Sequence, residues 1–357
     1  MRLDIDELRK GFFKKSLSVG YHNTTYSWTQ IMLIIINCIR GLESLEEGAK
    51  SPSAQTVRDR LLLDGEWDDH FHKGMWKIAL WAVKRFQRLR WYVSIDETHI
   101  PFFGKRKRLN KQLVKQGFGN LVHGYRAKTP GATGSFCFLV VSLCCSRIRI
   151  PIAIKMVGVG EDYELWLETV LKRLFVLVPQ ATLLADRGFG NRTWFYQMLE
   201  RLDIRYVVRI PLRKKENKNK VANGADRFQY WMTDSKTKEK VLLTVAVVKD
   251  GQERVYFFAH NLVKTGKYLL HTYTHRWDLE NIFKDCDRAE LPTSTRNPRM
   301  RLYSVMLSFF LFTLWQAEKS ITKKRQSLRS FIKSILEKIC NIIRCSILPE
   351  GRIIRPP

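Results

Sequence analysis

The sequence predicts an α/β fold with a mixed sheet flanked by helices, a β-rich insertion and an N-terminal helical domain. Three patterns indicate this. Apolar and polar residues alternate as in strands after Trp91, helical and strand-like segments alternate after Gly158, and short strand-like runs return after residue 211. The chain has 357 residues, 45% of them hydrophobic, which suffices for two or three domains with a buried core.

Residues 1–90 are expected to be mostly helical. The apolar run from Ile31 to Ile39 fits a buried helix, and Ser53 precedes a second helix with one apolar face. The two helices around Gly48 fit either a helix-turn-helix that reads DNA or an ordinary helical hairpin, and the sequence does not decide between them. A further helix is expected from Asp68 to Leu89.

The central part begins with three predicted strands. Residues 91–103 alternate in polarity and stop at Gly104, which places Asp96 at or near the end of the first strand. Phe136 to Cys144 and Ile148 to Val157 follow with short links, so we expect an antiparallel meander. The basic stretch KRKRLNKQLVK after the first strand fits either a solvated loop or a surface that holds a nucleic-acid backbone.

Helices and strands then alternate. Tyr163 to Phe175 and Thr193 to Leu202 are predicted helices, and Ala181 to Ala185 and Ile204 to Arg209 are predicted buried strands. Asp186 follows the first of these strands directly. Two predicted strands, the first and the fourth, therefore carry an aspartate at their carboxyl ends.

The insertion and the segments after it complete the fold. A charged, mobile loop at 213–220 precedes a predicted hairpin, Val241 to Lys249 and Arg254 to His260. The strand-like run Lys267 to Thr272 leads into a long helix that opens with YTHRWDLENIFK, Tyr273 to Lys284. Residues 302–316 are expected to form an apolar helix, and residues 318–357 a basic, loosely held tail.

The charge balance points to a polyanionic partner. Sixty-two Lys and Arg against thirty-four Asp and Glu leave a net charge of +28, spread along the chain, and nucleic acid is the first candidate. The seven cysteines form no C-x-x-C pair, which fits neither a zinc site nor a disulfide framework and indicates a reducing cytoplasm. The apolar runs at 31–39 and 303–315 fall short of the ~20 residues of a membrane helix.

Three acidic residues stand where an α/β site forms, since such sites lie outside the carboxyl ends of strands. Asp96 and Asp186 follow strands, and Glu280 shares one face of its predicted helix with Tyr273 and Arg276 at positions i, i+3 and i+7. Clustered carboxylates repel one another unless cations bridge them, and their hard oxygens suit Mg²⁺. Two such ions can activate an attacking oxygen and stabilise a leaving one in phosphoryl transfer.

The segments SIDETHIPFFG, LLADRGFGNRTWF and YTHRWDLENIFK resemble the three conserved blocks of DDE transposases from prokaryotic insertion sequences. The subgroup is the one with a Tyr-x2-Arg-x3-Glu signature and a β-rich insertion before the glutamate. The resemblance covers about residues 50–316 and implies an RNase H-like catalytic domain. The domains would then be a helical DNA-binding domain at 1–90, the catalytic domain in two parts at 91–210 and 269–317, the insertion at 211–268 and the basic tail at 318–357.

The resemblance also assigns roles to single residues. Asp96, Asp186 and Glu280 would be catalytic and would hold two Mg²⁺ ions, with Mn²⁺ able to substitute. Tyr273 and Arg276 would contact phosphate near the cut. The signature often continues to a lysine seven positions after the glutamate, where this chain has Asp287, so the role falls to Lys284 or Arg288.

The other polar residues near the blocks keep alternative readings. Arg187 either holds the DNA backbone or forms an exposed salt bridge. Glu97 points away from Asp96 on a strand and is not expected to be a ligand. His99 and His123 either flank the site or are hydrogen-bonded structural residues. Trp231, in the insertion, is a candidate for stacking a flipped base.

The resemblance implies a cut-and-paste transposase, associated with DNA in the cytoplasm. It would bind the terminal inverted repeats of its element and the target DNA as a homodimer, without a membrane partner. Two alternatives stay open at this point. One is an RNase H-like nuclease without strand transfer, and the other is a catalytically inactive DNA-binding protein derived from a transposase.

Overall fold

The computed structural model describes residues 38, 53, 67–124, 130–211, 226–234, 237–250, 254–287, 296–323, 326–335 and 337. The chain divides into two compact units, residues 82–282 and residues 1–81 together with 283–357, and each is described by itself. Several predictions concern positions outside the described residues: the helices at 31–39 and after Ser53, the motif around Gly48, the loop at 213–220, and Arg288.

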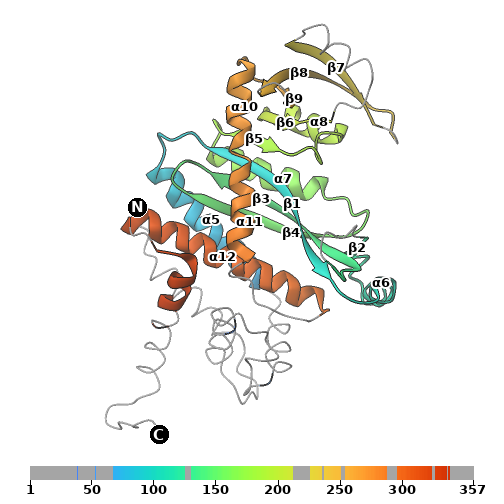
Figure 1. Ribbon diagram of the computed structural model, residues 1–357, viewed down its shortest axis with the longest axis vertical. Coiled ribbons are helices and arrows are strands. Elements are labelled where there is room, and N and C mark those ends of the chain that lie inside the picture. Colours follow the sequence, from blue (N-terminus) through green and yellow to red (C-terminus); the bar gives the residue numbers. More distant parts are fainter. Residues whose placement is uncertain are drawn as a thin grey trace. The chain divides into compact units, whose positions relative to one another are not determined.

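The larger unit is built on one mixed sheet (Figure 1), in which the described residues form nine strands ordered β2-β3-β1-β5-β6-β9-β8-β7, with β4 also paired to β3. Strands β1, β5 and β6 run parallel to one another, and the other pairs are antiparallel. The predicted meander and mixed sheet are confirmed. The strands are β1 (Tyr92–Phe102), β2 (Val122–His123), β3 (Gly134–Cys144), β4 (Arg149–Val157), β5 (Thr182–Ala185), β6 (Arg205–Arg209), β7 (Arg227–Thr233), β8 (Lys240–Asp250) and β9 (Arg254–His260).

Helices cover both faces of this sheet (Figure 1). On one face lie α7 (Glu164–Leu177) and α8 (Thr193–Arg201), and on the other α10 (Gly266–Thr274) and α11 (Trp277–Asp287). Strand β3, GSFCFLVVSLC, is buried along its whole length, as expected for a strand covered on both sides. The sheet is therefore the middle layer of three, and side chains on its two faces meet different helices.

The β-rich insertion extends the sheet. Its predicted hairpin is present as β8 and β9, and β9 pairs antiparallel with β6 from Val207–His260 to Arg209–Phe258. After β9, the Asn261 side chain accepts from the Tyr206 amide at 3.0 Å and donates to the Ile204 carbonyl at 2.9 Å. Asn261, where the chain leaves the insertion, is thus hydrogen-bonded to the beginning of β6.

The basic stretch after β1 is a helix, α6 (Arg106–Lys115), so the expectation of a loop was wrong. Its only buried side chain is Leu113, and the Asn110 side chain bonds both backbone groups of Val122, at 2.9 Å each. These contacts fix the helix beside β2 while its charged residues face outward.

The smaller unit is helical where it is described. It contains the first part of α5 (Trp67–Arg85) and the long helix α12 (Pro298–Thr322), which is capped by Asn297. Phe71 packs on Phe310 with ring centroids 5.5 Å apart, and a Cβ at Gly74 would lie 2.6 Å from the Phe310 ring, so this glycine allows a close approach of the two helices.

The tail is better ordered than expected where the structure describes it. Residues 328–335 are helical, and Leu328, Phe331, Ile332 and Ile335 are buried on one face. The expectation of a loosely held tail was therefore wrong for this stretch. None of the described helices combines the length and apolar composition needed to cross a membrane.

Candidate active site

Asp96 and Asp186 lie side by side because their strands are paired in parallel. The pairing of β1 with β5 ends at Ile95 and Ala185. The residues that follow these two along the chain are Asp96 and Asp186. The prediction that β1 itself ends near Asp96 was wrong, since β1 continues to Phe102 along β3. What ends at Ile95 is the partner strand, so Asp96 still stands where the sheet opens.

The loop after β5 holds the Asp186 carboxylate. The Gly188 amide donates to Asp186 Oδ1 at 2.7 Å. Phe189 is buried and anchors the loop, and a Cβ at Gly190 would lie 2.3 Å from the Arg209 carbonyl oxygen. The sequence DRGFG thus supplies a carboxylate, a turn that orients it, and a glycine where the backbone passes close to β6.

Glu280 lies on the second of two short helices, α10 and α11. The prediction of a strand at 267–272 was wrong. Those residues belong to α10, which begins where the Thr265 side chain accepts from the Tyr268 amide. A turn at 275–276 separates α10 from α11. Tyr273, Arg276 and Glu280 therefore do not share one unbroken helix, although the turn keeps them close to one another.

Arg276 joins the acidic residues. Its Nη1 donates to Asp96 Oδ2 at 2.9 Å and its Nη2 to Glu280 Oε1 at 2.5 Å. The Arg276 side chain is only 10% exposed, and its guanidinium lies 5.6 Å from the centre of the Tyr273 ring. Tyr273 is itself buried in the apolar cluster around Phe258. The structure thus brings together four of the residues predicted for the site, with Asp186 next to Asp96.

The surroundings of Asp96 perturb the ionisation of its carboxyl group. Burial raises the pKa of Asp96 to about 7, and the negative charge of Asp186 adds to this effect. Arg276 and the Glu97 amide, which donates to Asp96 Oδ1, act in the opposite direction without cancelling it. Burial likewise raises the pKa of Tyr273 to about 12. A carboxyl group so strongly perturbed beside other carboxylates is typical of functional sites.

The donor set fits hard divalent ions. Among the described residues, Asp186 Oδ2 and Glu280 Oε2 have no hydrogen-bond partner, whereas Asp96 Oδ2 is held by Arg276. Three carboxylates supply oxygen ligands of the kind that Mg²⁺ and Mn²⁺ prefer. Asp96 adjoins both of the others, next to Asp186 in the sheet and bridged to Glu280 by Arg276.

Two contacts that fix the turn before α11 were not predicted. Arg149, at the start of β4, pairs with Asp278 at 2.8 Å, and the Tyr92 ring stacks on His275 at 4.3 Å. They hold the residues on either side of Arg276 against the sheet. The partners lie far apart in the sequence, and no local pattern marks them.

Arg187 and Lys284 are exposed. Arg187 forms no ion pair among the described residues, so its predicted alternative as a salt bridge is not observed. It lies at a hollow of about 740 Å³ next to Asp186, lined by Asp186, Arg187, Gly188, Asn191, Arg209, Ile210, Pro211, Val255 and Phe257. Lys284 follows Glu280 by one turn of α11 and belongs to the smaller unit.

The opposite face of β1 carries a different set of polar residues. Glu97 accepts from the Tyr163 hydroxyl at 3.1 Å and from Arg192 at 3.2 Å, on the face covered by α7 and α8. His99 Nδ1 lies 3.1 Å from Ser135 Oγ. His123 bonds the Val157 carbonyl oxygen at 2.8 Å. The histidines do not flank Asp96, and Glu97 points away from it as predicted.

Comparison with known proteins agrees with this architecture. Residues 88–301, more than half of the chain, match the family model described as "Transposase DDE domain". The chain therefore belongs to the DDE transposase domain family, whose members depend on divalent metal ions. No curated protein sequence matches it significantly.

A solved transposase structure has a similar fold. A piggyBac transposase, in a synaptic complex with hairpin DNA, is similar with a TM-score of 0.55 and 13% identity, over 98% of this chain and 80% of that one. The Mos1 transposase in its paired-end complex matches 53% of this chain and 60% of that one at 17% identity. Its TM-score of 0.19 is too low to indicate a shared fold. The first likeness shows that the mixed sheet and its helices form a transposase catalytic fold.

Proposed function

We propose that the protein is a cut-and-paste transposase, which binds the terminal inverted repeats of its element as a homodimer, cleaves the DNA there and joins the freed 3′-hydroxyl to target DNA. The observation that carries the proposal is that Arg276 bonds both Asp96 and Glu280, while Asp186 follows the strand paired with β1 directly beside Asp96. Family membership and the fold agree with it.

The three carboxylates would hold two Mg²⁺ ions, with Mn²⁺ as a substitute. When bound, such ions lower the pKa of an attacking water and neutralise charge that develops on the phosphate. The protein supplies the geometry. The Gly188 amide orients Asp186, and the Glu97 amide orients Asp96. Because these donors belong to the backbone of the loop and of β1, the carboxylates are set before DNA arrives.

The Arg276 guanidinium donates hydrogen bonds to two carboxylates. It is bonded to Asp96 and Glu280, and a guanidinium released from Asp96 would be free to donate to a phosphate oxygen. The phosphate contact predicted for Arg276 is proposed in this form. Tyr273 lies beneath the guanidinium and would keep it in position by a cation–π contact.

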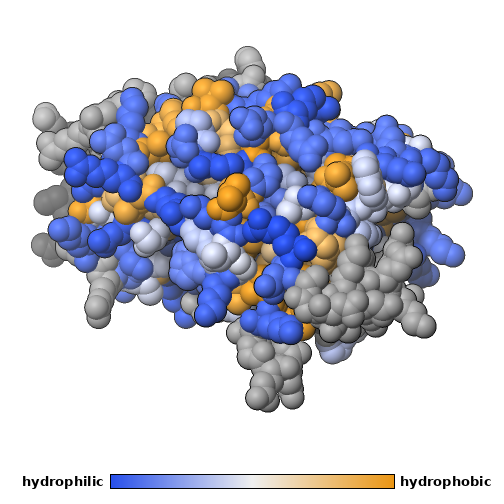
Figure 2. All heavy atoms as spheres, turned by 90° about the horizontal axis from the view of Figure 1, so that it is seen from above, coloured by the Kyte–Doolittle hydropathy of each residue, from blue (hydrophilic) through white to orange (hydrophobic). Residues whose placement is uncertain are grey.

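Other basic residues would hold the DNA backbone. Helix α6 contains no acidic residue and carries five basic ones, and its charged face is exposed. Figure 2 shows a face on which hydrophilic side chains predominate and hydrophobic ones form separate patches. Arg187, beside the hollow at Asp186, and Lys284 complete the proposed contacts. The basic residues of α6 are Arg106, Lys107, Arg108, Lys111 and Lys115.

The closer relationship to the Tyr-x2-Arg-x3-Glu subgroup of insertion sequences is also proposed, on the sequence Tyr273-x2-Arg276-x3-Glu280. The β-rich insertion between β6 and α10 supports it. Trp231 is 58% exposed on β7 and is available for stacking on a base.

A strand-transfer assay tests the proposal. The purified protein is incubated with DNA ends taken from the sequences that flank its gene, a target plasmid, and Mg²⁺ or Mn²⁺. We expect cleaved and joined products from the wild type, and none from Asp96→Asn, Asp186→Asn or Glu280→Gln, each of which should bind the ends as the wild type does. Asp69→Asn is the control, since Asp69 lies in the smaller unit, where it forms an exposed pair with Lys73.

Each result separates the candidate functions. Joined products support the transposase, and cleavage without joining would instead indicate a nuclease. Binding with no cleavage in either metal would indicate a DNA-binding protein without catalysis. Cleavage by any one of the three variants would remove that residue from the site.

A further inference from the structure

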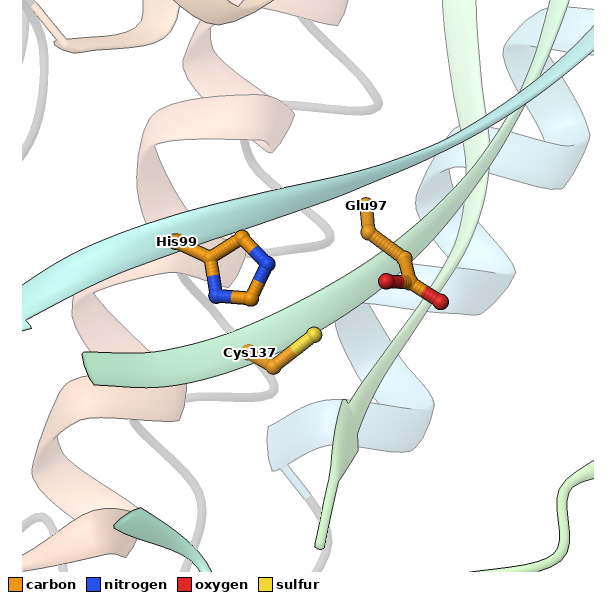
Figure 3. Close-up of side chains that lie close together, drawn as sticks. All are labelled: Glu97, His99 and Cys137. Atoms are coloured by element: carbon orange, nitrogen blue, oxygen red, sulfur yellow. The ribbon is translucent and has the colours of Figure 1, made fainter. Parts of the chain in front are cut away.

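Three side chains on the face of β1 opposite Asp96 converge on one point. Glu97 and His99 are two residues apart on β1 and so share a face, and Cys137 stands directly across from His99 in the pairing with β3. A carboxylate oxygen, a ring nitrogen and the sulfur all lie within 4.8 Å of one another. Figure 3 shows the carboxylate, the imidazole ring and the thiol close together beside the two strands.

The donor types select a particular class of ion. One oxygen, one nitrogen and one sulfur form a set suited to Zn²⁺ and related borderline-soft ions, whereas Mg²⁺ and Mn²⁺ prefer oxygen alone. We propose that Glu97, His99 and Cys137 form a binding site for a zinc-class divalent ion, separate from the carboxylate site on the other face of β1.

The required geometry is within reach of small side-chain movements. With Zn–S near 2.3 Å and Zn–N near 2.0 Å, ligand atoms of a tetrahedral site lie about 3.5 Å apart. The three donors would therefore approach one another by at most about 1.3 Å from their limit of 4.8 Å. His99 is exposed, so its ring can adjust and the fourth position is open to water.

The charges around the site favour a cation. Arg192 and the Tyr163 hydroxyl both contact Glu97 Oε1, and Oε2 has no hydrogen-bond partner among the described residues. With the Cys137 thiolate, the carboxylate and Arg192 together, the site would carry one net negative charge. Burial raises the pKa of Cys137 to about 12, so an ion has to displace the thiol proton, as Zn²⁺ does in coordinating thiols.

The surroundings also orient the histidine. The Ser135 hydroxyl lies 3.1 Å from His99 Nδ1. A hydrogen bond to one ring nitrogen is the usual way in which a metal-binding histidine is fixed in place. Partial desolvation of the ring lowers the pKa of His99, which favours the neutral form that can bind a metal ion. An ion here would join β1 to β3 one residue away from Asp96.

Cobalt titration of the metal-free protein, without DNA, tests this site. A cysteine thiolate bound to Co²⁺ gives a near-ultraviolet charge-transfer absorption, which we expect to saturate at one equivalent. Zn²⁺ should abolish it, and excess Mg²⁺ should not. Cys137→Ser should remove the absorption, and His99→Gln should weaken Co²⁺ binding at least tenfold.

Two controls separate this site from the rest of the protein. Cys145→Ser removes another buried thiol and should leave the absorption unchanged. Asp186→Asn alters the carboxylate site on the opposite face of the sheet and should also leave the Co²⁺ absorption unchanged. The absorption therefore tests this site independently of the proposed catalytic function. Absence of the absorption in the wild type, or its persistence in Cys137→Ser, would overturn the proposal. If Cys137→Ser does not fold, His99→Gln at an exposed position decides, and unaltered Co²⁺ affinity there would overturn it.

Discussion

Replacing Asp96 with asparagine should change how the stability of the protein depends on pH. The ordinary pKa of an aspartate, 3.8, is raised to about 7 at Asp96 by burial and by the charge of Asp186. The native protein therefore holds a proton on Asp96 that the unfolded chain releases between about pH 4 and pH 7. Stability is highest while both states are protonated and is lost as the pH rises through this window.

The size of the effect follows from the same values. At about 1.4 kcal/mol for each pH unit, the rise from 3.8 to about 7 corresponds to a loss of about 4 kcal/mol from pH 4 to pH 8. Asparagine has the shape of the protonated acid and does not ionise, so this loss is absent in Asp96→Asn. The difference in unfolding free energy between Asp96→Asn and the wild type should therefore shift in favour of the variant by about 3 kcal/mol from pH 5 to pH 8.

Urea unfolding of both proteins in a chelating buffer, followed by fluorescence and far-ultraviolet circular dichroism, measures the difference. All other titrating groups are common to both proteins, so the difference between the two pH profiles reports Asp96. Parallel profiles would refute the electrostatic reasoning. Addition of Mn²⁺ should stabilise the wild type more than Asp96→Asn, because a bound cation removes the repulsion and the variant lacks one ligand.

The remaining predictions concern the support of the site and its DNA contacts. Arg276→Ala should lower the free energy of unfolding by about 3 kcal/mol or more in urea experiments, because it leaves the largely buried Asp96 carboxylate without its partner. An unchanged urea midpoint would contradict this. Gly190→Ala should destabilise the protein by about 1–3 kcal/mol, since its Cβ would meet the Arg209 carbonyl, and an unaltered melting temperature would count against it. Lys107→Ala and Lys111→Ala should each weaken DNA binding and reduce its salt dependence by about one unit of slope, whereas weaker binding at an unchanged slope would exclude a phosphate contact.

Much of the fold could be predicted because its signals are local. The first strand of the meander follows from alternation of polarity within a few residues, and the strand before Asp186 from a short apolar run. Asp186 could be placed at the end of its strand in this way, whereas Asp96 lies within β1 and is set beside Asp186 by the parallel pairing of β1 with β5. The helices at 106–115 and 266–274 were missed, since dense positive charge in one and β-favouring residues in the other hid their helical spacing.

The detailed geometry of the site depends on contacts between distant segments. The sequence placed Arg276 near Glu280, but its bond to Asp96 arises only when α11 packs over β1. The pair Arg149–Asp278 likewise joins elements that have no relation in sequence. The cluster of Glu97, His99 and Cys137 escaped a search for C-x-x-C spacing, because its members meet across two strands.

The pairing of β9 with β6 also determines where the sheet is vulnerable to association with other chains. Without the insertion, β6 would be an edge strand, and its apolar centre, Tyr206 to Val208, would present unpaired backbone groups to other strands. The insertion moves the edge to β7, which is seven residues long and mostly exposed, with Arg227 at its start. A chain shortened by removal of β7 to β9 would therefore be prone to aggregate through β6, independently of any effect on catalysis.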